Sequence, residues 1–192
     1  MILRGCYILN ASKLSQEIGV ASTTIAEYYQ ILEDCLVAHR IDPICDRKTR
    51  RRLIKSPKYL IFDLGVRRIA ANEGRRLSKN QFEDLFEQFV GLELIRVSQI
   101  SEGFKVRYWR DSNGPEVDFI IESAKRYIPI EVKWSDKPNK HDARHLEIFM
   151  DEYSQAKKGY IICQTPLSYD LSSRVTAISW RDIQEIFDGI DQ

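Results

Sequence analysis

Two short apolar stretches of the chain each carry charged residues, Asp118 in the first and Glu131 with Lys133 in the second. Side chains alternate between the two faces of a β-strand, so Asp118 is expected to point away from the face that Val117 and Phe119 share. By the same alternation Glu131 and Lys133 project together, about 6.6–6.8 Å apart along their strand. Charge placed among apolar neighbours is costly unless it is paired or binds a metal. Two acids and a lysine that meet in this way can hold a divalent cation and a water.

This arrangement predicts metal-dependent hydrolysis of a phosphodiester. Asp118 and Glu131 are expected to bind Mg²⁺ (or Mn²⁺) directly, with the backbone carbonyl of Val132 as a third ligand and waters completing the shell. A bound metal lowers the pKa of a water and neutralises charge on the phosphate. Lys133 would help to orient and deprotonate that water, or offset negative charge in the transition state.

A further acidic ligand is expected from the helix that precedes these strands. Glu87 is the candidate, and Glu83, one helical turn earlier, is the alternative. The competing interpretation is that all these residues are surface charges on an edge strand, whose ion pairs add little stability. A third interpretation is a retained fold with a weakened or lost activity.

The elements around these residues follow a definite order. Apolar residues at helical spacing predict a helix from about Lys79 to Val97, and alternating patterns predict strands and helices after it. The expected strands are 104–110, 116–122 and 127–134, followed by a helix over 140–153, a buried strand over 159–163, a strand over 175–179 and a helix over 180–187. The resulting order αβββαβ predicts an α+β or α/β domain over residues 80–192.

Residues 1–75 are expected to form a separate domain, because a polar segment that contains glycine, 72–80, follows them. A helix that begins at the N-cap Ser12 and ends at Gly19, then a second helix from Ser22, predict a helix-turn-helix. Strands over 36–41 and 59–62 complete the pattern of a winged helix.

We expect this first domain to bind DNA. The second helix would place Thr23, Thr24 and Tyr28 in a major groove, and a basic run would lie along phosphates as the wing. That run consists of Arg47, Lys48, Arg50, Arg51 and Arg52. The alternative is a protein-contact domain that uses the same fold.

Together, the acidic and basic residues and the order of elements resemble the PD-(D/E)xK nuclease superfamily. The matching residues are Asp118, Glu131 and Lys133. Glu131 follows Asp118 by thirteen positions and Lys133 follows it by fifteen. The resemblance implies a restriction-endonuclease-like fold and a metal-dependent nuclease.

A second resemblance covers nearly the whole chain. Segments 85–94, 108–111, 114–118 and 130–133 are similar to the C-terminal domain of unknown function that many prokaryotic AAA-type ATPases carry, and 14–20 and 57–65 are similar to the region upstream of it. In that family an ATPase module precedes these parts. This chain has no G-x-x-x-x-G-K-[ST] phosphate loop, so it is not expected to be an ATPase itself. From the resemblance we expect either the C-terminal piece of a larger protein or a shortened member of the family.

The overall composition excludes few classes of protein. The chain has 192 residues, with 29 Lys and Arg against 28 Asp and Glu, so its net charge does not indicate a partner. No apolar stretch approaches the roughly 20 residues that span a bilayer. The four cysteines are scattered and expected to be reduced. We therefore expect a cytoplasmic protein without a membrane partner.

Two functions remain open from the sequence. The first is a metal-dependent nuclease-like hydrolase acting on DNA. The second is a non-catalytic DNA-binding or regulatory module with a degenerate nuclease fold that serves an ATPase module or partner. A module for protein interaction, of the kind found in toxin–antitoxin systems or mobile elements, is a weaker third.

Overall fold

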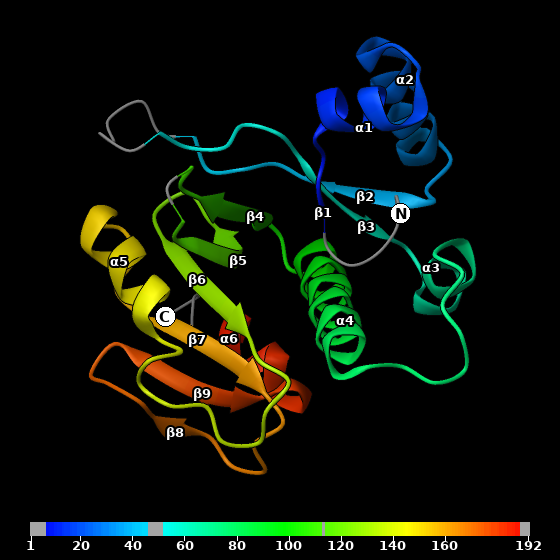
Figure 1. Ribbon diagram of the computed structural model, residues 1–192. Coiled ribbons are helices and arrows are strands. Elements are labelled where there is room, and N and C mark those ends of the chain that lie inside the picture. The colour runs from blue at the N-terminus through cyan, green and yellow to red at the C-terminus, as the bar shows by residue number, and fades with distance from the viewer. Residues whose placement is uncertain (1–6, 46–51, 113, 189–192) are drawn as a thin grey trace.

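The protein is a mixed α+β structure with two β-sheets (Figure 1). The computed structural model describes residues 7–45, 52–112 and 114–188. In this part of the chain one sheet has three strands in the order β1-β3-β2, and the other has six in the order β4-β5-β6-β7-β9-β8. No helix among the described residues is long and apolar enough to cross a membrane. Cys35, Cys45 and Cys163 are free thiols.

The six-stranded sheet follows a long helix, α4 (Lys79–Ile100). Ser78 caps this helix, and Gln81 completes a capping box because its side chain accepts from the Ser78 backbone N–H. Three antiparallel strands follow, β4 (Lys105–Arg110), β5 (Glu116–Glu122) and β6 (Tyr127–Val132). After α5 (Arg144–Glu152), the strands β7 (Gly159–Cys163) and β9 (Val175–Ser179) continue the sheet in parallel.

The predicted order of helix and strands is confirmed, with differences at the ends of elements. β6 ends at Val132 rather than Trp134, and α5 begins at Arg144 because the preceding residues form turns. A short edge strand, β8 (Tyr169–Asp170), was not predicted. The last helix divides into a 3₁₀ turn (Trp180–Asp182) and α6 (Ile183–Asp188).

Helices cover both faces of the six-stranded sheet. Under α4 and α6 lies one core cluster, which includes Phe119, Ile121 and Ile130. Under α5 lies a second, which includes Val117 and Ile120. The expectation that Val117, Phe119 and Ile121 share one face is therefore wrong for Val117.

A β-bulge in β5 explains this difference. Arg107 pairs with Ile120 and Trp109 pairs with Val117, so two steps along β4 match three steps along β5. The additional residue interrupts the alternation of faces between Val117 and Ile120, which is the stretch that contains Asp118. Bulges of this kind re-aim side chains and often lie beside active sites.

The N-terminal part holds the smaller sheet and three helices. Its elements are β1 (Tyr7–Ile8), α1 (Ala11–Ile18), α2 (Ser22–Asp34), β2 (Ala38–Ile41), β3 (Lys58–Ile61) and α3 (Leu64–Ala70). The two helices and the strand pair β2–β3 were predicted, whereas β1 and α3 were not. Ser12 is not the N-cap of α1, because the Asn10 side chain accepts from the Lys13 N–H at 2.9 Å. Gly19 ends the helix with a φ of 73°, as glycine can without strain.

Helix α4 packs against both sheets. Ile41 and Leu60 of the smaller sheet belong to the same core cluster as α4 and Phe119. A Cβ at Gly91 of α4 would lie 2.6 Å from both the Leu60 Cδ1 and the Phe119 Cζ atoms. Only glycine permits this close approach of the helix backbone. The two sheets are thus held together through α4.

The residues that flank the basic run lie along β4. The Ile44 N–H donates to the Tyr108 carbonyl at 2.8 Å, and the Ile54 N–H donates to the Arg110 carbonyl at 3.0 Å. Both of these flanking segments lead away from α2 and toward the six-stranded sheet (Figure 1). Of the basic run itself, Arg47, Lys48, Arg50 and Arg51 lie outside the described residues.

Candidate catalytic site

Asp118 lies where β5 and β6 separate. The last paired residues of these strands are Phe119 and Ile130, and one further step in that register sets Asp118 opposite Glu131. At this position the Asp118 side chain takes the place of the backbone in the hydrogen bonding between the strands. Its Oδ2 atom accepts from the Val132 N–H at 2.8 Å. The carboxylate is therefore fixed beside the two residues that were predicted to act with it.

Glu131 is buried and only partly satisfied. It is 6% exposed, and its Oε1 atom accepts from the Lys133 Nζ at 2.7 Å. Its Oε2 atom is buried and has no hydrogen-bond partner among the described residues. An unpartnered carboxylate oxygen at this depth costs free energy, which a bound cation or a proton would recover.

Glu87 reaches the same region from α4, but it is already paired. Its Oε1 atom lies 2.9 Å from the Nζ atom of Lys58 in β3, and the same ammonium donates to the Asp118 carbonyl at 3.3 Å. Glu83, the alternative ligand, forms an exposed pair with Lys79 at 3.7 Å.

Lys58 was missed as a site residue, although the sequence contained a signal for it. Lys58 and Leu60 share a face of β3 by the two-residue period, and Leu60 is fully buried. A lysine on an apolar face of a strand needs an acidic partner, and Glu87 provides it.

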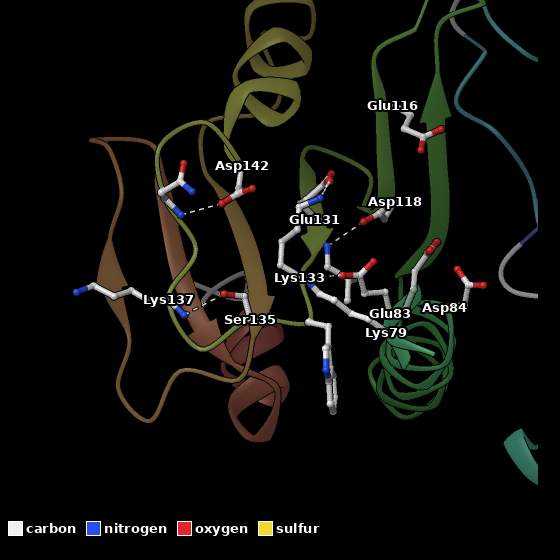
Figure 2. Close-up of a pocket in the computed structure, with 14 residues that line it drawn as sticks. Lys79, Glu83, Asp84, Glu116, Asp118, Glu131, Lys133, Ser135, Lys137 and Asp142 are labelled. Carbon is white, nitrogen blue, oxygen red and sulfur yellow. Dashed lines mark hydrogen bonds and ion pairs between the residues drawn. The ribbon is translucent and has the colours of Figure 1, made fainter. Parts of the chain in front are cut away.

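A cavity of about 510 Å³ opens over these residues. Figure 2 shows Asp118 and Glu131 beside one another on neighbouring strands, with Glu83 next to them on α4. The lining is strongly polar and largely acidic, and it comprises Lys79, Glu83, Asp84, Glu87, Glu116, Asp118, Glu131, Val132, Lys133, Trp134, Ser135, Lys137, Asn139 and Asp142. A cation has ready access to such a site.

The acids at the base of this cavity resist ionisation. Burial raises the pKa of Asp118 to about 6, and the Glu87 charge adds to the effect, while Lys58 and the Val132 N–H oppose it. Burial also raises the pKa of Glu131 well above its usual value, and Asp118 adds to it against the pull of Lys133. Burial lowers the pKa of Lys133, but the Glu131 carboxylate raises it more, so the lysine stays charged. Burial therefore makes ionisation of both carboxyl groups unfavourable, and neighbouring acids add to the effect.

The residues at this site fit a single hard divalent cation that keeps several of its waters. In the part of the chain that the structure describes, no three His, Cys, Asp or Glu residues are grouped closely enough to hold a metal ion. Asp118 and Glu131 remain as a pair of carboxylates, one of which has an unsatisfied oxygen. Mg²⁺ is commonly held by one or two carboxylates with waters in its other positions.

The residues predicted to contact DNA lie elsewhere. On α2, Thr23 is exposed, Thr24 is half-buried and Tyr28 is 59% exposed. Arg52 is exposed beside β4, and its carbonyl accepts from the Ser112 N–H at 2.8 Å. None of these four residues lines the acidic cavity.

A two-sheet α+β protein with a carboxylate–lysine site is the class that this fold and site define. Residues 82–183 match a domain of unknown function, DUF4143, and residues 5–102 match a second, DUF8612. Because each match spans more than half of the chain, the chain belongs to both families. The two matches share residues 82–102, which are almost entirely α4.

The similar proteins of known sequence are longer than this chain. An uncharacterized protein of Mycobacterium tuberculosis is 25% identical over 132 residues, which are 69% of this chain and 30% of that protein. An uncharacterized protein of Haemophilus influenzae is 25% identical over 153 residues, 77% of this chain and 36% of that protein. The chain thus spans about a third of the length of these relatives.

One of the solved structures that match this chain is a large assembly. It is a half-complex from a tetradecameric assembly of Thermococcus gammatolerans McrB AAA+ hexamers with bound McrC. The superposition has a TM-score of 0.42 and 11% sequence identity, and it covers 56% of this chain and 33% of that one.

Proposed function

We propose that this chain is a metal-dependent nuclease-like hydrolase that cleaves phosphodiesters in DNA. The observation that carries the proposal is the meeting of Asp118, Glu131 and Lys133 at the point where β5 and β6 separate, under a polar cavity. The order α4-β4-β5-β6-α5-β7 supports a restriction-endonuclease-like domain of the PD-(D/E)xK type. The arrangement of α1, α2, β2 and β3 supports a winged helix that binds DNA.

Each site residue has a separate task in this proposal. Asp118 and Glu131 would hold Mg²⁺ or Mn²⁺, which when bound lowers the pKa of a water and offsets charge on the phosphate. The Val132 N–H holds the Asp118 carboxylate in place. Lys133 fixes Glu131 and presents a positive charge at the cavity, where it can orient the water or stabilise the negative transition state.

Cleavage of plasmid DNA by the purified chain in Mg²⁺ or Mn²⁺ tests the proposal. Asp118→Asn, Glu131→Gln and Lys133→Met should each lower the rate about a hundredfold or more, as loss of electrostatic stabilisation does in other hydrolases. Lys125→Met is the matched control, because Lys125 is exposed in the turn at the other end of the β5–β6 hairpin. No cleavage by the unaltered chain, or equal cleavage by Lys133→Met, would defeat the catalytic proposal.

A second candidate is a non-catalytic DNA-binding or regulatory module. It is favoured by the ion pairs that already occupy Glu87 and Glu131, and by the exposure of Thr23 and Tyr28 on α2. Because the matching region is only about a third of each of these curated relatives, such a module would serve other parts of a longer protein, an ATPase module among them. DNA binding that weakens with salt, without cleavage, supports this candidate.

A further inference from the structure

Lys58 is the most completely enclosed cation near the acidic cavity. It is 6% exposed, and its ammonium lies 2.9 Å from Glu87 Oε1 and 3.3 Å from the Asp118 carbonyl. The same Nζ atom lies 5.0 Å from the centre of the Phe119 ring and 5.6 Å from that of Tyr108. Two aromatic faces and two oxygens thus surround the Lys58 ammonium and hold it in place.

The backbone that carries this ammonium is held from both sides. Lys58 pairs with Ile8 of β1 and with Ile41 of β2, in the central strand of the three-stranded sheet. Leu60, two residues later on the same face, is buried against α4. A shift of Lys58 away from Glu87 would therefore require the smaller sheet to separate from α4.

The position of Lys58 decides what Glu87 can bind. A second, smaller cavity of about 220 Å³ is lined by Lys58 and shares Glu87, Glu116 and Asp118 with the acidic cavity. A divalent cation on Glu87 would stand beside the fixed ammonium, and like charges at such short range repel strongly. Glu131 also pairs with an ammonium, that of Lys133, but the Lys133 side chain is 36% exposed and can turn toward solvent, whereas that of Lys58 is 7% exposed. The buried Oε2 atom of Glu131, moreover, has no hydrogen-bond partner among the residues described.

We propose that Lys58 takes the place of a second metal ion: the site binds one divalent cation, on Asp118 and Glu131, and the Lys58 ammonium supplies the second positive charge, on Glu87. This inference rests on the proposed function. Both sheets then contribute to the site, because the positive charge on Glu87 comes from Lys58 of β3 whereas the two metal ligands come from β5 and β6. Lys58 is a positioning residue here, because it acts through Glu87 and the Asp118 backbone.

Direct measurement of Mn²⁺ binding tests the inference without reference to cleavage. Free Mn²⁺ is followed by electron paramagnetic resonance, and heat by calorimetry, for the full chain and its variants. The unaltered chain should bind one Mn²⁺, and Glu87→Gln should change that affinity by less than about threefold, because Glu87 is not a ligand. Asp118→Asn should weaken binding about tenfold or more.

The Lys58→Met variant should then release Glu87 for a cation. It keeps the length of the side chain but not the charge, and it should bind a second Mn²⁺ or bind the first about tenfold more tightly. The double variant Lys58→Met with Glu87→Gln should lose that gain. Lys125→Met is the control, since Lys125 is exposed and lines neither cavity.

The outcomes separate the inference from the proposed function. One Mn²⁺ bound equally by the unaltered chain and by folded Lys58→Met overturns the inference alone. A tenfold loss of Mn²⁺ affinity in Glu87→Gln also overturns it, and this variant keeps the test decisive if Lys58→Met does not fold by circular dichroism. No Mn²⁺ bound by the unaltered chain or by any variant overturns both. Binding by Lys58→Met alone also overturns both, because the unaltered chain would then hold no divalent cation on Asp118 and Glu131.

Discussion

The two sheets differ in how their surroundings are packed. The six-stranded sheet is covered on both faces, by α4 and α6 on one and by α5 on the other, with a buried core under each. The three-stranded sheet shares the first of these cores through Ile41 and Leu60. The helices α1 and α2 contribute much less to a buried core, because α1 has no buried residue and Ile25 is the buried residue of α2.

This difference divides the N-terminal part into two regions with different roles. Strand β3 packs with the six-stranded sheet and its helices, since Leu60 lies in the core cluster of α4 and Lys58 reaches the candidate site. The helix pair instead leaves large apolar side chains exposed, namely Ile18, Val20, Tyr28 and Ile31. We infer that β3 maintains the site whereas α1 and α2 remain available for contact with a partner. Four predictions test this division, and the largest expected effect is given first.

Truncation of Leu60 should cost the most stability. Leu60 is fully buried between the smaller sheet and α4, so Leu60→Ala should lower the free energy of unfolding by about 3 kcal/mol. Urea denaturation measures this loss. Ile69→Ala is the control on the same N-terminal part, because Ile69 is 83% exposed and its loss should change stability by less than about 0.5 kcal/mol. Equal effects of the two variants would show that the smaller sheet is not part of the core.

Added volume at Gly91 should also destabilise the contact between the sheets. A Cβ there would meet Leu60 and Phe119 at 2.6 Å, so Gly91→Ala should cost about 1–3 kcal/mol despite the better helix propensity of alanine. Thermal unfolding followed at 222 nm gives the size of the loss. Gly74→Ala is the matched control, because a Cβ at Gly74 would meet nothing within 4 Å. A neutral or stabilising Gly91→Ala would mean that α4 can move away from both sheets.

The sequence was sufficient to predict most elements of the six-stranded sheet and its helices, because the signals for them are local. The strands 116–122, 159–163 and 175–179 were predicted with the bounds that the structure has, since each is an apolar run between clear turns. Helix α4 was predicted within three residues at its end because its apolar residues recur at helical spacing over five turns. In both cases the residues of a single element carry the information.

The features that the sequence did not reveal depend on contacts between distant segments. The bulge in β5 cannot be recognised from the sequence of β5 alone, because it is defined by how the residues of β5 pair with those of β4. The two-residue strands β1 and β8 are too short to show a pattern, and they exist because they pair with β3 and β9. Likewise the convergence of Asp118, Glu131 and Lys133 followed from their strands, whereas the capture of Glu87 by Lys58 did not.

Removal of the Asp118 charge should stabilise the metal-free protein at neutral pH. The folded pKa of Asp118 is about 6, above the value of 3.8 of an unperturbed aspartate, so the folded state binds this proton more tightly than the unfolded state. Stability from this group therefore falls as the pH rises from about 4 to about 6, and the full penalty persists above pH 6. Asp118→Asn should raise the free energy of unfolding by about 2 kcal/mol at pH 7.5 and by little at pH 4.

Chemical denaturation in EDTA at the two pH values measures this gain. Asparagine keeps an oxygen that can accept from the Val132 N–H, so the substitution removes charge with little change of shape. Glu122→Gln, at the other end of β5, is the control, because Glu122 is paired with Arg107 at 2.8 Å and should not be stabilised by neutralisation. A stability of Asp118→Asn that equals that of the unaltered chain at pH 7.5 would show that the buried Asp118 charge does not destabilise the fold.

Loss of a helix cap should have the smallest effect, and it compares the two parts of the molecule directly. Ser78 caps α4 and Asn10 caps α1 by the same kind of hydrogen bond, from a backbone N–H three residues ahead to the side-chain oxygen. Ser78→Ala should lower global stability by about 1 kcal/mol, because α4 unfolds only with the core that both sheets share. Asn10→Ala removes an equivalent bond from a helix without a buried residue.

Native-state hydrogen exchange distinguishes the two losses. In Asn10→Ala the amides of α1 should exchange faster, whereas those of α4 and the six-stranded sheet should be unchanged, because α1 opens by local unfolding. In Ser78→Ala the slowest amides of both sheets should exchange faster together, by about fivefold for 1 kcal/mol. If Asn10→Ala instead accelerates exchange throughout the chain, α1 is coupled to the core, and the helix pair is as much a part of the site's support as β3.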